Sequence, residues 1–131
     1  MTKLLHLRHF ALLLIMALSS CASNSTINIP PGEEFVLGEQ ENSSFRLELK
    51  NLGREIIDVR AVDKTEGVQT QGFGLDGKSK ARLRIRRGEM AVISNPSQEA
   101  IKVKAKMTKT VAGMRYQPIP DTSSPEEVPK R

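Results

Sequence analysis

The feature that most constrains the fold is an alternation of apolar and charged residues in several short runs. In residues 81–86 three arginines alternate with Ala81, Leu83 and Ile85, and in residues 101–106 three lysines alternate with apolar residues in the same way. Successive side chains of a β-strand point to opposite faces, so each run places its apolar residues on one face. Residues 45–50 and 57–61 alternate likewise. The pattern predicts half-buried antiparallel strands.

Turn-forming residues separate these runs at a regular interval, beginning with Pro30-Pro31-Gly32 and ending with Asn95-Pro96-Ser97. Residues 89–94 lack the alternation and predict a strand covered on both faces. The sequence therefore predicts an all-β fold, a small antiparallel β-sandwich of six or seven strands over residues 33–114. An immunoglobulin-like sandwich and a small open barrel both fit this spacing. The four prolines of residues 115–131 predict a disordered tail.

The amino-terminal end shows no such alternation and instead resembles a secretory signal in its order of basic and apolar residues. Lys3 and Arg8 precede an apolar run of about nine residues, which is too short to span a bilayer as a helix but suits a secretory signal. Leu18-Ser19-Ser20-Cys21 follows this run. This order resembles the lipobox of bacterial lipoproteins.

The resemblance covers residues 1–21 only and concerns where in the cell the chain is located. It implies that residues 1–20 are a cleaved signal peptide and that the Cys21 thiol carries a diacylglycerol. Residues 21–32 are then the lipidated cysteine and a polar tether. The implied location is the cell envelope, with the membrane bound through the amino-terminal lipid. Ala22 is not the aspartate of an inner-membrane retention signal, so the resemblance implies the outer membrane if the organism has one.

The composition excludes several kinds of chemistry. Both histidines, His6 and His9, lie in the predicted signal, and Cys21 is the only cysteine. The mature chain therefore lacks the side chains of Ser-His-Asp and Cys-His catalysis and of ordinary zinc sites, so we expect no catalytic residue, metal or cofactor. Paired carboxylates remain, with Glu33-Glu34 and Glu39/Glu41 as candidates. The alternative function is thus a carboxylate-based envelope enzyme or accessory subunit acting on a glycan, which needs two carboxylates about 5–10 Å apart.

Charge is segregated along the chain. Residues 33–76 carry five Lys/Arg against ten Asp/Glu, whereas residues 77–109 carry ten against two. If residues 81–86, 90–94 and 101–106 form a meander, two basic rows flank one apolar strand. That arrangement predicts a face that binds an anionic glycan, an anionic lipid or an acidic protein. The alternative is that these charges only form a solvated surface of the sheet. Nucleic acid is not expected, because few aromatic residues are available for stacking. The candidate residues of this face are Arg82, Arg84, Arg86, Lys102, Lys104 and Lys106.

These observations together predict a non-catalytic, membrane-anchored lipoprotein of the cell envelope that acts as a binding or assembly module. A purely structural role, in which the domain packs against a larger envelope complex, is also open. The position of residues 82–86 and 102–106 on one sheet face, or on two, separates the basic-face hypothesis from its alternative.

Overall fold

The computed structural model describes residues 23–121. Cys21, the predicted signal peptide 1–20 and residues 122–131 of the predicted tail lie outside this range. Within it the chain forms nine β-strands and no helix, so it contains no helix long and apolar enough to cross a membrane. The strands are β1 (Ser23–Ile29), β2 (Glu33–Leu37), β3 (Phe45–Asn51), β4 (Ile57–Asp63), β5 (Gln69–Leu75), β6 (Lys80–Ile85), β7 (Glu89–Ser94), β8 (Ile101–Met107) and β9 (Met114–Pro118).

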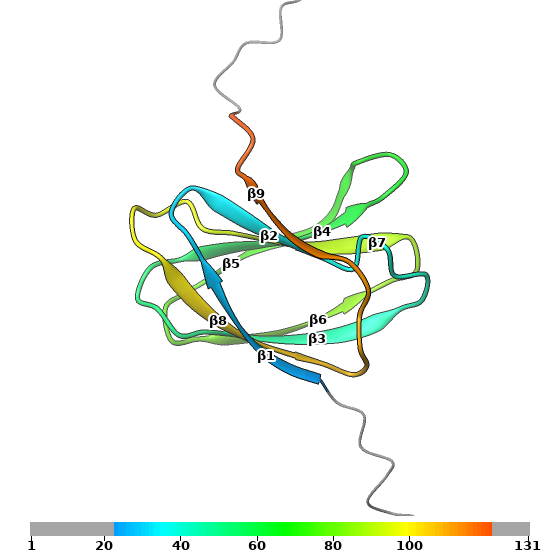
Figure 1. Cartoon of the computed structure of the whole chain (residues 1–131), viewed down its shortest axis with the longest axis horizontal. Coiled ribbons are helices and arrows are strands. Elements are labelled where there is room, and N and C mark those ends of the chain that lie inside the picture. Colours follow the sequence, from blue (N-terminus) through cyan, green and yellow to red (C-terminus); the bar gives the residue numbers. More distant parts are fainter. Residues whose placement is uncertain (1–22, 122–131) are drawn as a thin grey trace, which may run out of the picture.

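The strands form two antiparallel sheets that pack face to face (Figure 1). Sheet A has the order β1-β8-β3-β6, and sheet B has the order β5-β4-β7-β2-β9. The predicted small antiparallel β-sandwich is therefore confirmed. Every alternating run of the sequence forms a strand that turns its apolar residues inward, and all of these are buried except the half-buried Ala81. In β8, Ile101, Val103, Ala105 and Met107 are buried and the three lysines between them are exposed.

The strand order corrects the immunoglobulin-like expectation. In an immunoglobulin sandwich several consecutive strands are neighbours in one sheet. Here β4 and β5 are the only consecutive strands of the described chain that pair with each other. Apart from this pair, the strands β1 to β8 alternate between the two sheets, in the manner of a double-sheet jelly roll. Period-two patterning sets which residues are buried in a strand, but it carries no information about which strands become neighbours.

Two strands lie where the sequence predicted irregular chain. Residues 23–29, expected as part of a polar tether, form β1, which pairs along its whole length with β8 and buries Ile27 and Ile29. Residues 115–118, expected to begin the disordered tail, belong to β9, which pairs with β2. The Phe35 and Tyr116 rings meet edge to face there, with centroids 5.0 Å apart. Both are edge strands with few apolar residues, so the alternation of apolar and polar residues could not reveal them. With these two strands the described domain has nine strands and covers residues 23–118.

The core lies between the sheets and is built from aliphatic side chains, with Phe35 and Phe45 as its buried aromatic residues among those described. All of its buried members fall between Ile27 and Val111. Burial of aliphatic side chains at about 25 cal/mol per Å² is the main stabilising term in such a fold. Because every strand and core residue of the described range follows Ala22, a chain that starts at Ala22 contains the whole sandwich as described.

Two buried asparagines fix the loops at one end of the sandwich. The Asn51 amide donates to the carbonyl oxygens of Glu55 and Leu75, at 2.7 and 3.1 Å. The Asn95 amide donates in the same way to those of Ile29 and Glu99, at 3.0 and 2.7 Å. Each amide therefore satisfies loop carbonyls that would otherwise be buried without a partner. β1 begins at the opposite end of sheet A, which is the end that carries the candidate site.

Candidate anion-binding face

The two basic runs of the sequence lie on one sheet but are not adjacent. β6 and β8 both pair with β3, which separates them in sheet A. The meander that the sequence left open is not formed, because β7 belongs to sheet B, where it pairs with β2 and β4. Its residues therefore contribute no apolar strip between the basic rows. The charged strand β3 occupies that place instead.

The outward side chains of β3, β6 and β8 form a surface that we call the basic face. Its strands run in register, so their outward residues line up across the sheet. Along each strand, outward residues are about 6.6–7 Å apart, and neighbouring strands are about 4.8 Å apart. Glu48 is the one acidic residue of this described surface, against eight cations: Arg46, Lys50, Lys80, Arg82, Arg84, Lys102, Lys104 and Lys106.

Like charges stand directly opposite each other in two rows of this face. Lys50 of β3 is in register with Lys80 on one side and with Lys104 on the other. Arg46 is in register with Arg84. Within residues 23–121 none of these five cations forms an ion pair. Like charges directly opposite each other destabilise a sheet, so these rows cost stability when no anion is present.

A third row is partly compensated. Glu48 lies in register between Lys106 and Arg82. The Arg82 guanidinium donates to the Glu48 carboxylate at 3.2 Å, with 85% of the Arg82 side chain exposed. An exposed pair of this kind contributes at most about 1 kcal/mol. Glu48 therefore orients Arg82 but leaves the face strongly positive.

Five of the six predicted candidates belong to the face, and one does not. Arg82, Arg84 and the three lysines of β8 project from it and are exposed. Arg86 lies beyond the end of β6, in the turn to β7, where its backbone N–H donates to the Glu89 carboxylate at 3.3 Å. The sequence reasoning missed Arg46, Lys50 and Lys80. Their outward direction follows from alternation, but their position beside the basic runs follows only from the pairing of β3.

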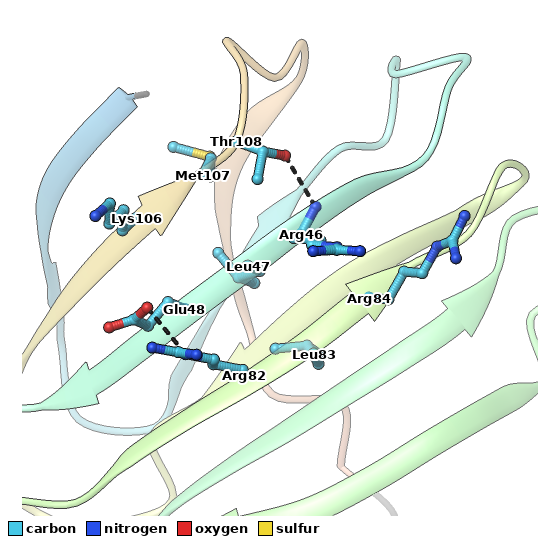
Figure 2. A pocket seen from close by; sticks show the side chains of 9 residues that line it. All are labelled: Arg46, Leu47, Glu48, Arg82, Leu83, Arg84, Lys106, Met107 and Thr108. Carbon is cyan, nitrogen blue, oxygen red and sulfur yellow. Dashed lines mark hydrogen bonds and ion pairs between the residues drawn. The ribbon is translucent and has the colours of Figure 1, made fainter. Parts of the chain in front are cut away.

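The face contains a hollow of about 450 Å³ at one end of sheet A. Figure 2 shows its lining on three neighbouring strands, with the Glu48–Arg82 pair near the centre. The Arg46 backbone N–H donates to the Thr108 hydroxyl oxygen at 3.1 Å, which fixes that hydroxyl at the rim. We call this site the arginine hollow; its lining residues are Arg46, Leu47, Glu48, Arg82, Leu83, Arg84, Lys106, Met107 and Thr108.

The predicted carboxylate pairs are arranged differently from a catalytic dyad. Glu33 and Glu34 are neighbours in β2 and so point to opposite faces of sheet B. Glu34 is 2% exposed and accepts hydrogen bonds from Arg60 at 2.7 Å, from the Ser94 hydroxyl at 2.8 Å and from the Gln117 amide. Its carboxylate oxygens are thus occupied by three donors and are not exposed to a substrate.

Glu39 and Glu41, in the connection from β2 to β3, form ion pairs with cations that come much later in the sequence. The Arg115 guanidinium donates to Glu39 at 2.6 Å and lowers its pKa. Hydrogen bonds from the Lys109 ammonium, at 3.0 Å, and from the Ala112 backbone N–H lower the pKa of Glu41 to about 2. A glycosidase acid needs a raised pKa, so neither carboxyl is tuned for that role.

The described part of the chain contains no evident metal-binding site. Residues 23–121 bring together no group of three or more His, Cys, Asp or Glu side chains that could hold an ion. The basic face carries eight cations against the single carboxylate of Glu48 among the described residues, so it presents mainly hydrogen-bond donors. Its chemistry suits phosphate, carboxylate or sulfate groups.

Comparisons with known proteins give only distant likenesses of shape. No protein-family model matches the sequence, and no curated protein matches it. Solved structures of Bacillus subtilis oxalate decarboxylase are similar to this chain with a TM-score of 0.49. One of them, a deletion mutant, is 8% identical over 79% of this chain and 25% of its own. A second is 10% identical over the same shares. The chain thus spans about a quarter of the length of these proteins.

Proposed function

We propose that this chain is a lipid-anchored, non-catalytic protein of the bacterial cell envelope that binds an anionic partner through the basic face. The observation that carries the binding role is the pair of unrelieved like-charge rows, Lys104–Lys50–Lys80 and Arg46–Arg84. A sheet surface without a ligand gains nothing from such rows. Alternating charges would protect it equally well against aggregation without the repulsion.

The anchor rests on the lipobox-like residues 18–21 and on the position of β1. Ser23, the first residue of β1, follows Cys21 by only two residues. A lipidated Cys21 would therefore hold sheet A directly at a membrane surface, without the tether up to residue 32 that the sequence suggested. The expected destination is the outer membrane if the organism has one, because Ala22 follows the cysteine.

The anchor is tested by Cys21→Ser in the native host. We expect the wild-type protein to begin at Cys21 with diacylglycerol and acyl groups, as read by mass spectrometry of its amino-terminal peptide. The variant should keep residues 1–20 and carry no lipid. Ala22→Ser is the matched control and should be processed normally. A Cys21→Ser protein that is still cleaved after Ser20 and remains in the membrane fraction would refute the anchor.

The binding role is tested with residues 22–131 on a phosphate-substituted cellulose column. Lys50→Ser should elute at lower salt than the wild type, because it removes the central charge of a three-lysine row. Lys64→Ser is the matched control, since Lys64 is a half-buried lysine in the turn after β4 that donates to the Glu41 carbonyl oxygen. Equal shifts for the two variants would show that net charge, and not the basic face, governs binding.

A further inference from the structure

The arginine hollow lies in the same cross-strand row as the residue at which the described chain begins. Ser23 of β1 is in register with Met107 of β8, Met107 with Leu47 of β3, and Leu47 with Leu83 of β6. The last three residues all line the hollow. At about 4.8 Å per strand, Ser23 lies about 10 Å from β3 and about 14 Å from β6.

Covalent geometry limits how far Cys21 can be from this row. Two residues span at most about 7 Å, so Cys21 lies within about 17 Å of the β3 strand that crosses the hollow. The headgroup region on each side of a bilayer is several ångströms thick, and electrostatic attraction to it reaches about 8–10 Å at physiological salt. A lipid on Cys21 would therefore bring this end of sheet A within range of neighbouring headgroups.

Charge determines which face of the domain turns toward such a surface. The outward side of sheet B carries Asp58 and the two compensated pairs Arg60–Glu34 and Arg115–Glu39. It has no excess of cations comparable to the basic face. An anionic surface therefore attracts sheet A and not sheet B.

The hollow also has the donor geometry that a phosphate group requires. Arg46 and Arg84 stand opposite each other without an ion pair among the described residues, and a guanidinium can donate two parallel hydrogen bonds to a phosphate. Lys106 adds a third cation from β8. The Thr108 hydroxyl accepts from the Arg46 N–H and keeps its own proton to donate.

We infer that the arginine hollow binds the phosphate of an anionic phospholipid in the membrane surface to which Cys21 is anchored. This inference rests on the proposed anchor and basic face, and it names the ligand of that face. Arg46 and Arg84 donate hydrogen bonds to the phosphate from two sides. Glu48 orients Arg82 beside it, and Lys106 adds long-range electrostatic attraction. The remaining lysines of β8 and β3 extend the contact along the membrane. The domain then lies flat, with sheet A toward the lipid and sheet B away from it.

The test uses residues 22–131, which contain the complete sandwich but no lipid. Binding is measured by co-sedimentation with vesicles of phosphatidylcholine alone and with about 30 mol% phosphatidylglycerol, at about 0.05 and 0.15 M salt. We expect binding to the anionic vesicles only, weaker at the higher salt. Arg46→Ser and Arg84→Ser should each weaken it about fivefold.

Arg54→Ser is the matched control, because Arg54 is an exposed arginine in the connection from β3 to β4, beyond the other end of β3. It should change the affinity less than twofold. A drop equal to that of Arg46→Ser would overturn the inference, as would equal binding to the two kinds of vesicle. Thermal melting of each variant verifies that the fold is intact.

Two further arms identify the source of the anion. Titration with inorganic phosphate and with soluble polyglutamate tests a free anion and an acidic protein partner. If either binds with the Arg46 and Arg84 dependence while the anionic vesicles do not, the inference fails and the basic-face function stands. If the phosphate column also fails to separate Lys50→Ser from Lys64→Ser, the basic-face function fails as well. Unchanged processing of Cys21→Ser refutes the anchor alone.

Discussion

Lys50→Glu should stabilise the protein and at the same time weaken its binding, an unusual combination that follows from the cross-strand rows. Lys50 is opposite Lys80 and Lys104, so the substitution turns two repulsions into two attractions. At a charge separation of about 7 Å in water, each pair changes by about 1.2 kcal/mol. Screening by salt and the entropy of long exposed side chains reduce the total for two pairs to about 1 kcal/mol.

For a domain of this size, 1 kcal/mol raises the melting temperature by about 4–8 °C. The assay is thermal unfolding of residues 22–131 followed by circular dichroism at about 0.02 M and about 1 M salt. The gain should be largest at low salt and vanish at high salt, where the Debye length falls to about 3 Å. In the vesicle assay the same variant should lose about 25-fold in affinity, because two units of charge are removed from the face.

Lys64→Glu is the control of opposite sign. Lys64 lies near Glu39 and donates to the Glu41 carbonyl oxygen, so an acidic residue there should lower the melting temperature. A lower melting temperature for Lys50→Glu at low salt, or a gain that does not depend on salt, would show that the like-charge rows cost the fold nothing. The principal argument for a ligand on the basic face would then be lost.

The other predictions concern Glu34 and Glu41, two of the four carboxylates that sequence analysis considered for catalysis. Arg60→Met should destabilise the fold by about 3 kcal/mol, because the buried Glu34 carboxylate then keeps hydrogen bonds only from the Ser94 hydroxyl and the Gln117 amide. Glu34→Gln should cost only about 1 kcal/mol. Urea unfolding measures both variants, and the reverse order of stability would contradict this account of the pair. The pKa of Glu41 is about 2 in the folded protein, below its ordinary value of 4.5, so its stabilising contribution is complete above about pH 4.5 and is lost as the pH falls toward 2. Glu41→Gln should remove that part of the pH dependence in melting experiments between pH 2 and 5, and an unchanged profile would refute the assignment.

The fold was predictable where alternation reaches the core. β3, β4, β6 and β8 each combine a buried apolar row with polar residues on the other side, and their direction in the sheet follows from the residues alone. β1 and β9 were not predictable. They are edge strands that depend on the backbone of a partner, and their polar residues are typical of a tether or a tail.

The site was predictable in its residues but not in its arrangement. The outward direction of Arg82 and Lys104 follows from period two, yet their relation depends on β3, which enters between them from the acidic half of the sequence. Pairing between strands far apart in the chain has no local signal in one sequence. The same limit applies to Glu34, whose burial depends on Arg60, 26 residues away.

The most direct test of the account is a map of the lipid contact on residues 22–131 by amide chemical-shift perturbation. The domain is titrated with bicelles that contain phosphatidylglycerol and, separately, with bicelles that contain only phosphatidylcholine. The account predicts that the anionic bicelles perturb the amides around Arg46, Glu48, Arg84 and Thr108 first, and that those of β4 and β7 do not move. Perturbation centred on sheet B, or equal responses to both bicelles, would contradict it.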